Sequence, residues 1–141
     1  MRNKAPLALM EQLVMLLVFA LAAALCLKVF VLSDQLSRRC EERDRAVVVA
    51  QNAAETMKIC KGNVIDCSEI SGGFADGSAW KIGYDLDWQQ TALDQAAYQV
   101  LVVPVASETE LLGTAEVCAR TIEGEQLFQL TVSWQEGDAH G

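Results

Sequence analysis

One acidic residue stands near the start of a long apolar stretch of the sequence. Residues 7–32 read LALMEQLVMLLVFALAAALCLKVFVL, in which only Glu11, Gln12 and Lys28 are polar or charged. A carboxylate at the centre of a bilayer costs about 2.5–3.5 kcal/mol, and less near an edge, so it is retained where something offsets that cost. A cation on a neighbouring helix offsets it, and so does hydration or protonation close to the headgroups. Glu11 is therefore a candidate contact site between membrane helices.

Other side chains offer little chemistry. The only histidine is His140, beside the C-terminus, so no Ser-His-Asp, Cys-His or HExxH arrangement can be built from this sequence. The acidic residues Asp85, Asp87 and Asp94 lack the spacing of a calcium-binding loop. The sequence predicts that the protein is not an enzyme and has no cofactor.

The cysteines predict one disulfide. There are five, an odd count that leaves at least one unpaired in an oxidising compartment. Cys60 and Cys67 flank the expected loop KGNVID, residues 61–66, and a bridge between them would stabilise the fold by roughly 2–3 kcal/mol. Zinc is the alternative for these thiols, but the chain has no CxxC pair. We predict a Cys60–Cys67 disulfide and no metal site.

The elements that position these residues begin with a membrane helix. At about 1.5 Å per residue, the 26 residues of segment 7–32 exceed the thickness of a bilayer core, about 30 Å. No second apolar run has this length, which predicts a single-pass membrane protein. Arg2 and Lys4 form a basic leader, residues 1–6, that favours a cytoplasmic N-terminus and an extracytoplasmic C-terminal domain. A cleaved secretory signal is the alternative, although its apolar region would be shorter.

An amphipathic helix is predicted to continue outside the membrane over residues 33–61. Residues 33–60 contain neither glycine nor proline, and Gly62 with Asn63 predicts the end of the helix. A narrow apolar stripe recurs at steps of three and four residues, which is typical of one helix face. Its members are Leu36, Cys40, Val47, Ala50, Ala54 and Met57. This stripe either forms a coiled coil or packs on a sheet.

Residues 62–141 are predicted to form a small β-rich domain. Strand patterns occur at 80–86, 97–105, 113–121 and 126–134, and Gly124 suits a tight hairpin between the last two. The last strand alternates apolar residues such as Phe128 and Val132 with polar ones, so one face is buried. We therefore expect an α+β fold in which the long helix covers one face of an antiparallel meander.

Together, these features resemble type IV pilins and the pseudopilins of type II secretion. The resemblance rests on a basic leader, an apolar helix with a glutamate near its start, an amphipathic continuation and a small antiparallel sheet. A prepilin peptidase cuts before the apolar segment in that family, and the fifth mature residue is glutamate. A cut between Pro6 and Leu7 would make Glu11 the fifth residue here. The family normally has glycine before the cut, where this chain has Pro6.

The resemblance implies a structural subunit of a membrane-anchored filament or secretion assembly. Glu11 would neutralise the Leu7 amine of a neighbouring subunit, so the expected partners are the membrane, other pilin-like subunits or itself, and prepilin peptidase. The alternative is an uncleaved single-pass envelope scaffold or interaction protein with an extracytoplasmic α+β domain. Nucleic acid is not an expected partner, because the net charge is -8 and phosphates require a basic face.

Overall fold

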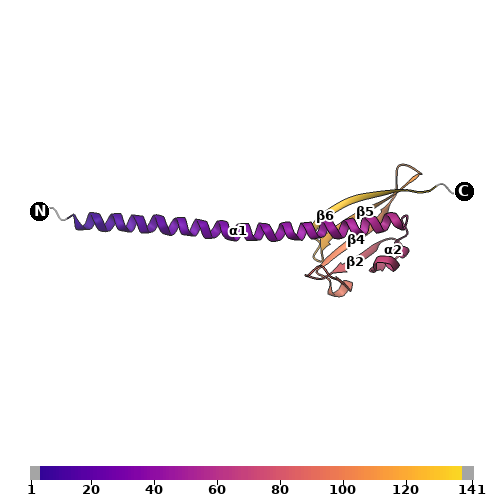
Figure 1. The fold of residues 1–141 in the computed structure, drawn as a ribbon, viewed down its shortest axis with the longest axis horizontal. Helices are drawn as coiled ribbons and strands as arrows, with labels where there is room; N and C mark the ends of the chain where they lie inside the picture. The colour runs from indigo at the N-terminus through magenta and orange to yellow at the C-terminus, as the bar shows by residue number, and fades with distance from the viewer. Residues whose placement is uncertain (1–3, 138–141) are drawn as a thin grey trace. The chain divides into compact units, whose positions relative to one another are not determined.

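The computed structural model describes residues 4–137 and has the predicted α+β architecture. A long helix, α1, precedes a short helix, α2, and a six-stranded antiparallel sheet (Figure 1). By its internal contacts the chain divides into two units, residues 1–40 and residues 41–141. The first unit is helical from Ala5 onward, whereas the second contains the end of α1, α2 and the sheet.

Helix α1 spans Ala5–Ile59 and begins two residues before the predicted boundary at Leu7. Pro6 lies in its first turn, where a missing backbone N–H removes no helical hydrogen bond. The helix ends at Ile59, two residues before the predicted end at residue 61, and Gly62 follows with a φ of 84° and an N–H that donates to the carbonyl of Met57 at 3.2 Å. A Cβ at Gly62 would also meet Trp134 at 2.4 Å, so both conformation and space require glycine there.

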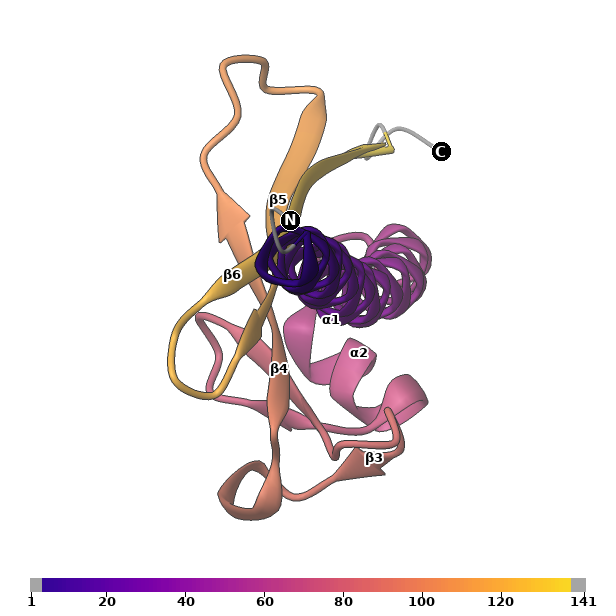
Figure 2. The same cartoon turned by 90° about the vertical axis from the view of Figure 1, so that its left-hand side faces the viewer.

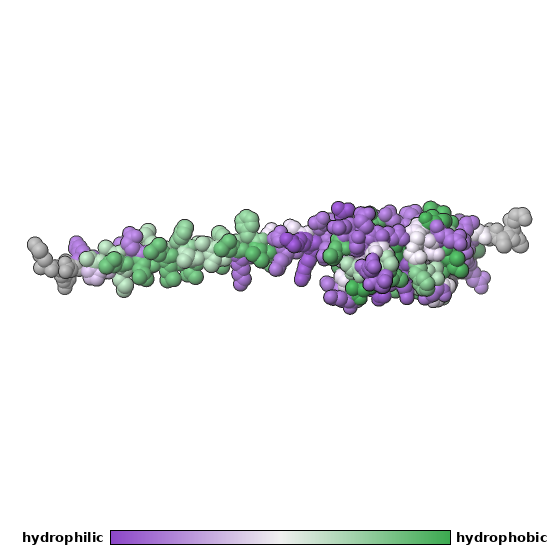
Figure 3. All heavy atoms as spheres, turned by 90° about the horizontal axis from the view of Figure 1, so that it is seen from below, coloured by the Kyte–Doolittle hydropathy of each residue, from purple (hydrophilic) through white to green (hydrophobic). Residues whose placement is uncertain are grey.

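The first unit exposes its apolar residues. Its large apolar side chains between Leu7 and Leu32 are all more than half exposed, and Figure 3 shows this stretch as almost uniformly hydrophobic. Among the described residues, α1 is the one helix long and apolar enough to cross a membrane.

The sheet of the second unit follows the predicted strands closely. The strands are β1 (Phe74–Ala75), β2 (Trp80–Tyr84), β3 (Gln90–Thr91), β4 (Tyr98–Val105), β5 (Leu112–Thr121) and β6 (Gln126–Gln135). Their order is β1-β2-β4-β5-β6, with β3 paired to β2, so β4 is central as its apolar composition on both faces requires. The tight turn between β5 and β6 places Gly124 at a φ of 103°, which confirms the predicted hairpin.

Four short elements are absent from the sequence-based prediction. Helix α2 (Val64–Ser71) occupies part of the segment expected to be a loop, because Asn63 caps it by accepting hydrogen bonds from the backbone N–H groups of Ile65 and Asp66. Strands β1 and β3 have two residues each, and a 3₁₀ turn spans Leu93–Gln95. Such short elements carry no periodicity that a sequence pattern could reveal.

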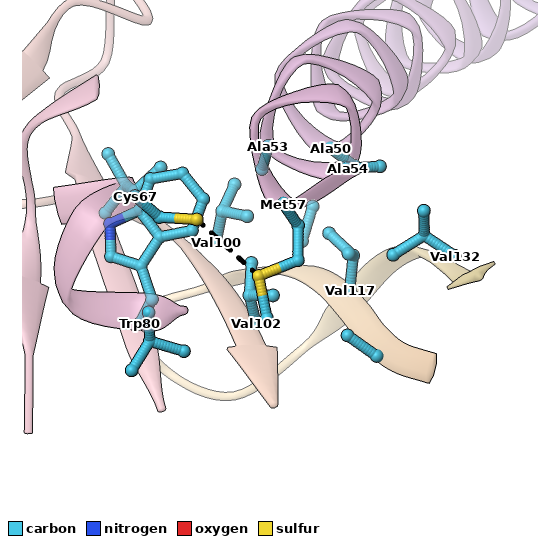
Figure 4. Close-up of a cluster of buried hydrophobic side chains, with 14 of the residues drawn as sticks. Ala50, Ala53, Ala54, Met57, Cys67, Trp80, Val100, Val102, Val117 and Val132 are labelled. Carbon is cyan, nitrogen blue, oxygen red and sulfur yellow. Dashed lines mark hydrogen bonds between the residues drawn. The ribbon is translucent and has the colours of Figure 1, made fainter. Parts of the chain in front are cut away.

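The core lies between the sheet and the two helices. Figure 2 shows α2 and the end of α1 on the same face of the sheet. Along α1 the buried residues are Ala46, Ala50, Ala53, Ala54 and Met57, and they form one cluster with Trp80, Val100, Val102, Val117 and Val132 of the strands (Figure 4). Packing on a sheet is therefore confirmed for the C-terminal part of the predicted stripe. Leu36 and Cys40, at its N-terminal end, are exposed.

We predict that enlarging Ala50 destabilises the second unit. Ala50 is 0% exposed, so Ala50→Leu should overfill the core and lower the free energy of unfolding by about 1–3 kcal/mol. The neighbouring Gln51 is exposed, and Gln51→Leu should change that free energy by no more than about 0.5 kcal/mol. Denaturant unfolding followed by tryptophan fluorescence measures both, since all three tryptophans lie in this unit. Equal stabilities of the two variants would contradict the burial of Ala50 on the inner face of α1.

Candidate functional site

Glu11 lies in the exposed apolar part of α1. It shares one side of the helix with Leu7, four residues earlier, and with Lys4, seven residues earlier, which places all three along a shallow surface groove. The groove is otherwise apolar, lined by Ala8, Met10, Val14 and Met15. Within residues 4–137 the two ion pairs are Asp34–Arg38 and Glu55–Lys58, so Glu11 has no cationic partner in the described part of the chain. A carboxylate is thus presented on an apolar surface without an internal counter-charge.

The predicted cleavage site falls within the first turn of α1. The helix begins at Ala5, so the bond between Pro6 and Leu7 is part of a helical turn. The N–H of Ala8 donates to the carbonyl of Lys4 at 3.2 Å, and this hydrogen bond spans the predicted scissile bond. Cleavage there would require this turn to open first.

The predicted disulfide is not present, because Cys60 and Cys67 are both free thiols. Cys67 is fully buried on α2, and its Sγ donates to the Sδ of Met57 at 3.6 Å and to the carbonyl oxygen of Thr56 at 3.8 Å (Figure 4). Its side chain is therefore engaged by α1 within the core. The prediction treated residues 61–66 as an open loop, whereas α2 begins at Val64 and sets Cys67 in the core, where Cys60 is its neighbour but is not bonded to it.

Burial raises the pKa of the Cys67 thiol to about 12, and the neighbouring Cys60 and Asp66 act in the same direction. The thiolate is the nucleophilic form of cysteine, so a buried thiol with a raised pKa is chemically inert near neutral pH. Cys67 thus acts as a core residue in the structure.

A polar contact without any signature in the sequence connects α1 to the sheet. The hydroxyl of Tyr98 donates to Oε1 of Glu42 at 3.0 Å, and the Tyr98 ring stacks on Trp88 with centroids 4.1 Å apart. Burial, followed by the nearby Glu42 carboxylate, raises the pKa of Tyr98. Glu42 and Tyr98 are 56 residues apart and belong to no motif. Trp80 and Trp134 are buried in the core, and Trp88 is half-buried on Tyr98.

The aspartates of the YDLD segment have a local structural role. Oδ1 of Asp85 accepts hydrogen bonds from the backbone N–H groups of Asp87 and Gln89, both at 2.9 Å, and so holds the turn after β2. No group of three His, Cys, Asp or Glu side chains within residues 4–137 is arranged to hold a metal ion.

No protein-family model, curated protein or solved structure matches this chain. The arrangement itself, a long apolar N-terminal helix packed at its C-terminal end on an antiparallel sheet, is compatible with a pilin-like architecture.

The thiols provide a direct test of the second unit. We predict that a maleimide at pH 8 modifies the exposed Cys40 readily and leaves Cys67 unmodified in the folded protein. With a pKa of about 12, only roughly one Cys67 thiol in ten thousand is ionised at that pH. Mass mapping of labelled peptides gives the result, and labelling in denaturant, where both cysteines should react, is the control.

The raised pKa of Cys67 also predicts that the stability of the fold depends on pH. The folded state favours the protonated Cys67 thiol, so this contribution is complete below the unfolded pKa of about 9 and is lost as the pH rises toward 12. The free energy of unfolding should therefore fall between pH 9 and pH 12, and the fall should be smaller in Cys67→Ala. An identical slope in both proteins would argue against this assignment.

Proposed function

We propose that this chain is a pilin-like or pseudopilin-like structural subunit of a membrane-anchored assembly. The apolar part of α1 crosses the membrane with the N-terminus in the cytoplasm, and the second unit lies outside. Neighbouring subunits pack through their membrane helices. The observation that carries the proposal is Glu11, a carboxylate without an ion-pair partner among residues 4–137, on the exposed apolar surface of a helix whose C-terminal part covers a small antiparallel sheet.

In this proposal, the exposed surface of α1 is covered by lipid and by helices of other subunits. An unpaired carboxylate in such a surface favours any arrangement that brings a cation to it. Cleavage between Pro6 and Leu7 by a prepilin peptidase supplies that cation, the new Leu7 amine. Because Leu7 and Glu11 lie one turn apart on the same side of α1, a neighbour shifted along the helix axis can present its amine to Glu11.

One observation favours a second function, an uncleaved single-pass envelope scaffold or interaction protein. Pro6 fits the first turn of α1, so the helix as it stands includes residues of the leader. In this alternative, Lys4 remains attached and lies on the same side of the helix as Glu11. The coiled-coil form of this alternative is not available to Ala46–Met57, since this stretch is buried against the chain's own sheet.

We predict that Glu11→Gln weakens helix association in membranes. Cys26 is an exposed cysteine within the apolar segment, so oxidative cross-linking at Cys26 reports when two α1 helices are adjacent. Loss of about 1.4 kcal/mol of pairing energy would lower the association constant tenfold. Glu110→Gln, an equally conservative change at an exposed site in the second unit, should leave the Cys26-linked fraction unchanged.

The measurement uses the full-length protein in native membranes with every other cysteine replaced by serine, apart from the buried Cys67. Cross-linking that is equally strong in wild type and Glu11→Gln would contradict the assembly role of Glu11. Absence of Cys26-linked dimers in the wild type would contradict helix packing itself and favour the scaffold function.

A further inference from the structure

The sheet ends in a long strand whose outer edge is free. β6 has ten residues, stands last in the strand order and, within residues 4–137, pairs only with β5. In an antiparallel pair, alternate residues direct their N–H and C=O groups toward one neighbour and the rest toward the other side. No backbone group of residues 126–135 bonds to another part of the chain within residues 4–137, apart from β5. A row of donors and acceptors is therefore unsatisfied along β6.

This edge lacks the features that normally protect an exposed strand. Natural edge strands are short, or carry lysine, proline, inward charges or bulges that prevent pairing with another chain. β6 reads QLFQLTVSWQ, with neither a charge nor a proline, and its one register irregularity lies near the start, opposite Ala119 and Arg120. At the other end of the sheet, β1 has only two residues. The β1 edge is thus short, as protected edges are, whereas the β6 edge is long and uncharged.

A groove follows the same edge. One wall is the exposed side of α1 at Gln51, Asn52, Glu55 and Lys58, and the other is β6 from Leu130 to Ser133, enclosing about 520 Å³. Both the inward residues Leu130 and Val132 and the outward residues Thr131 and Ser133 line it, so the groove runs along the strand edge itself. Lys58 pairs with Glu55 at 2.9 Å, which leaves the α1 wall without net charge.

We propose that the free edge of β6 binds an extended segment of another polypeptide as an additional strand. A row of alternating donors and acceptors is satisfied by a second backbone in extended form, and side-chain pockets then select the sequence. The groove selects an uncharged segment. In the bound segment, the inward residues are apolar and lie beside Leu130 and Val132, and the outward residues are polar and lie beside Thr131 and Ser133.

A second copy of this chain does not fit the edge. Within the second unit, β6 runs in the same direction as α1. Trp134, near the end of β6, lies beside Gly62, which follows the end of α1. Tyr98 of β4 pairs with Thr121, shortly before β6 begins, and its hydroxyl donates to Glu42, an earlier residue of α1. An antiparallel pair of β6 strands would reverse α1 in one of the two copies. In every copy the chain passes from the membrane-spanning segment into this unit at Glu41. A parallel pair of free edges would set the apolar face of one sheet beside the polar face of the other.

This exclusion of a second copy rests on the membrane anchoring proposed above, whereas the free edge does not. The test uses full-length protein in lipid nanodiscs and a labelled, end-blocked peptide with the sequence of residues 126–135, which alternates as the groove requires. A free peptide can approach in either direction. We expect saturable binding, together with slower amide hydrogen exchange in residues 126–135 of the protein.

The matched variants are Thr131→Lys at the edge and Thr109→Lys in the loop before β5, both at exposed threonines. Thr131→Lys should weaken peptide binding at least tenfold, whereas Thr109→Lys should bind as wild type does.

No binding, equal binding by both variants, or slowed exchange only outside residues 126–135 would overturn the proposal. Slowed exchange in β6 that grows with protein concentration without peptide would also overturn it, by making a second copy the occupant. Peptide binding by a protein that retains its leader would uphold the edge site and count against the pilin-like function.

Discussion

The burial of the alanine face of α1 against the sheet is the contact on which the second unit depends. The sheet is apolar on the face formed by Trp80, Val100, Val102, Val117 and Val132, and a sheet of this size cannot leave such a face in water. The helix supplies the cover through Ala46, Ala50, Ala53 and Met57, each at most 2% exposed. Helix α2 completes it with Val64 and Cys67. Because one helix provides most of the cover, the sheet and the end of α1 fold as one unit.

The burial of the alanine face determines which surfaces of the protein remain available for other contacts. Once the alanine face of α1 is buried, the helix can contact other molecules only through its apolar N-terminal part and its polar outer side. The N-terminal part exposes large apolar residues and one carboxylate, a combination suited to lipid and to neighbouring helices. The sheet, in turn, is covered on one face and unprotected at β6. The proposed helix assembly and the proposed strand binding therefore use different surfaces and are compatible with each other.

Much of the fold could be predicted from the sequence because its signals are long and regular. A stretch without glycine or proline specified most of α1. A nearly continuous apolar run specified β4, and alternating apolar residues specified β5 and β6, each strand to within one or two residues. The side of α1 away from its apolar stripe, including Asp44, Gln51 and Lys58, is exposed. The prediction failed where the determinant is a single side chain or a distant contact. Helix α2 depends on the Asn63 cap, and the Glu42–Tyr98 hydrogen bond joins positions that no local pattern relates.

The candidate sites were less predictable than the fold for the same reason. Glu11 could be recognised because a charge in an apolar helix is a local signal. The Cys60–Cys67 prediction used only their spacing, and the structure makes the two thiols neighbours without a bond between them, while Cys67 donates to Met57. The free edge of β6 has no sequence signal until the strand order is known, since the same ten residues would be unremarkable in the middle of a sheet.

The N-terminal residue of the protein recovered from its native membrane tests the central proposal most directly. Intact-mass measurement gives it without altering the chain. The pilin-like account predicts a mature protein that begins at Leu7, which makes Glu11 the fifth residue and releases the amine that it would pair with. A protein that retains the leader through Pro6 would contradict that account and favour the uncleaved envelope scaffold.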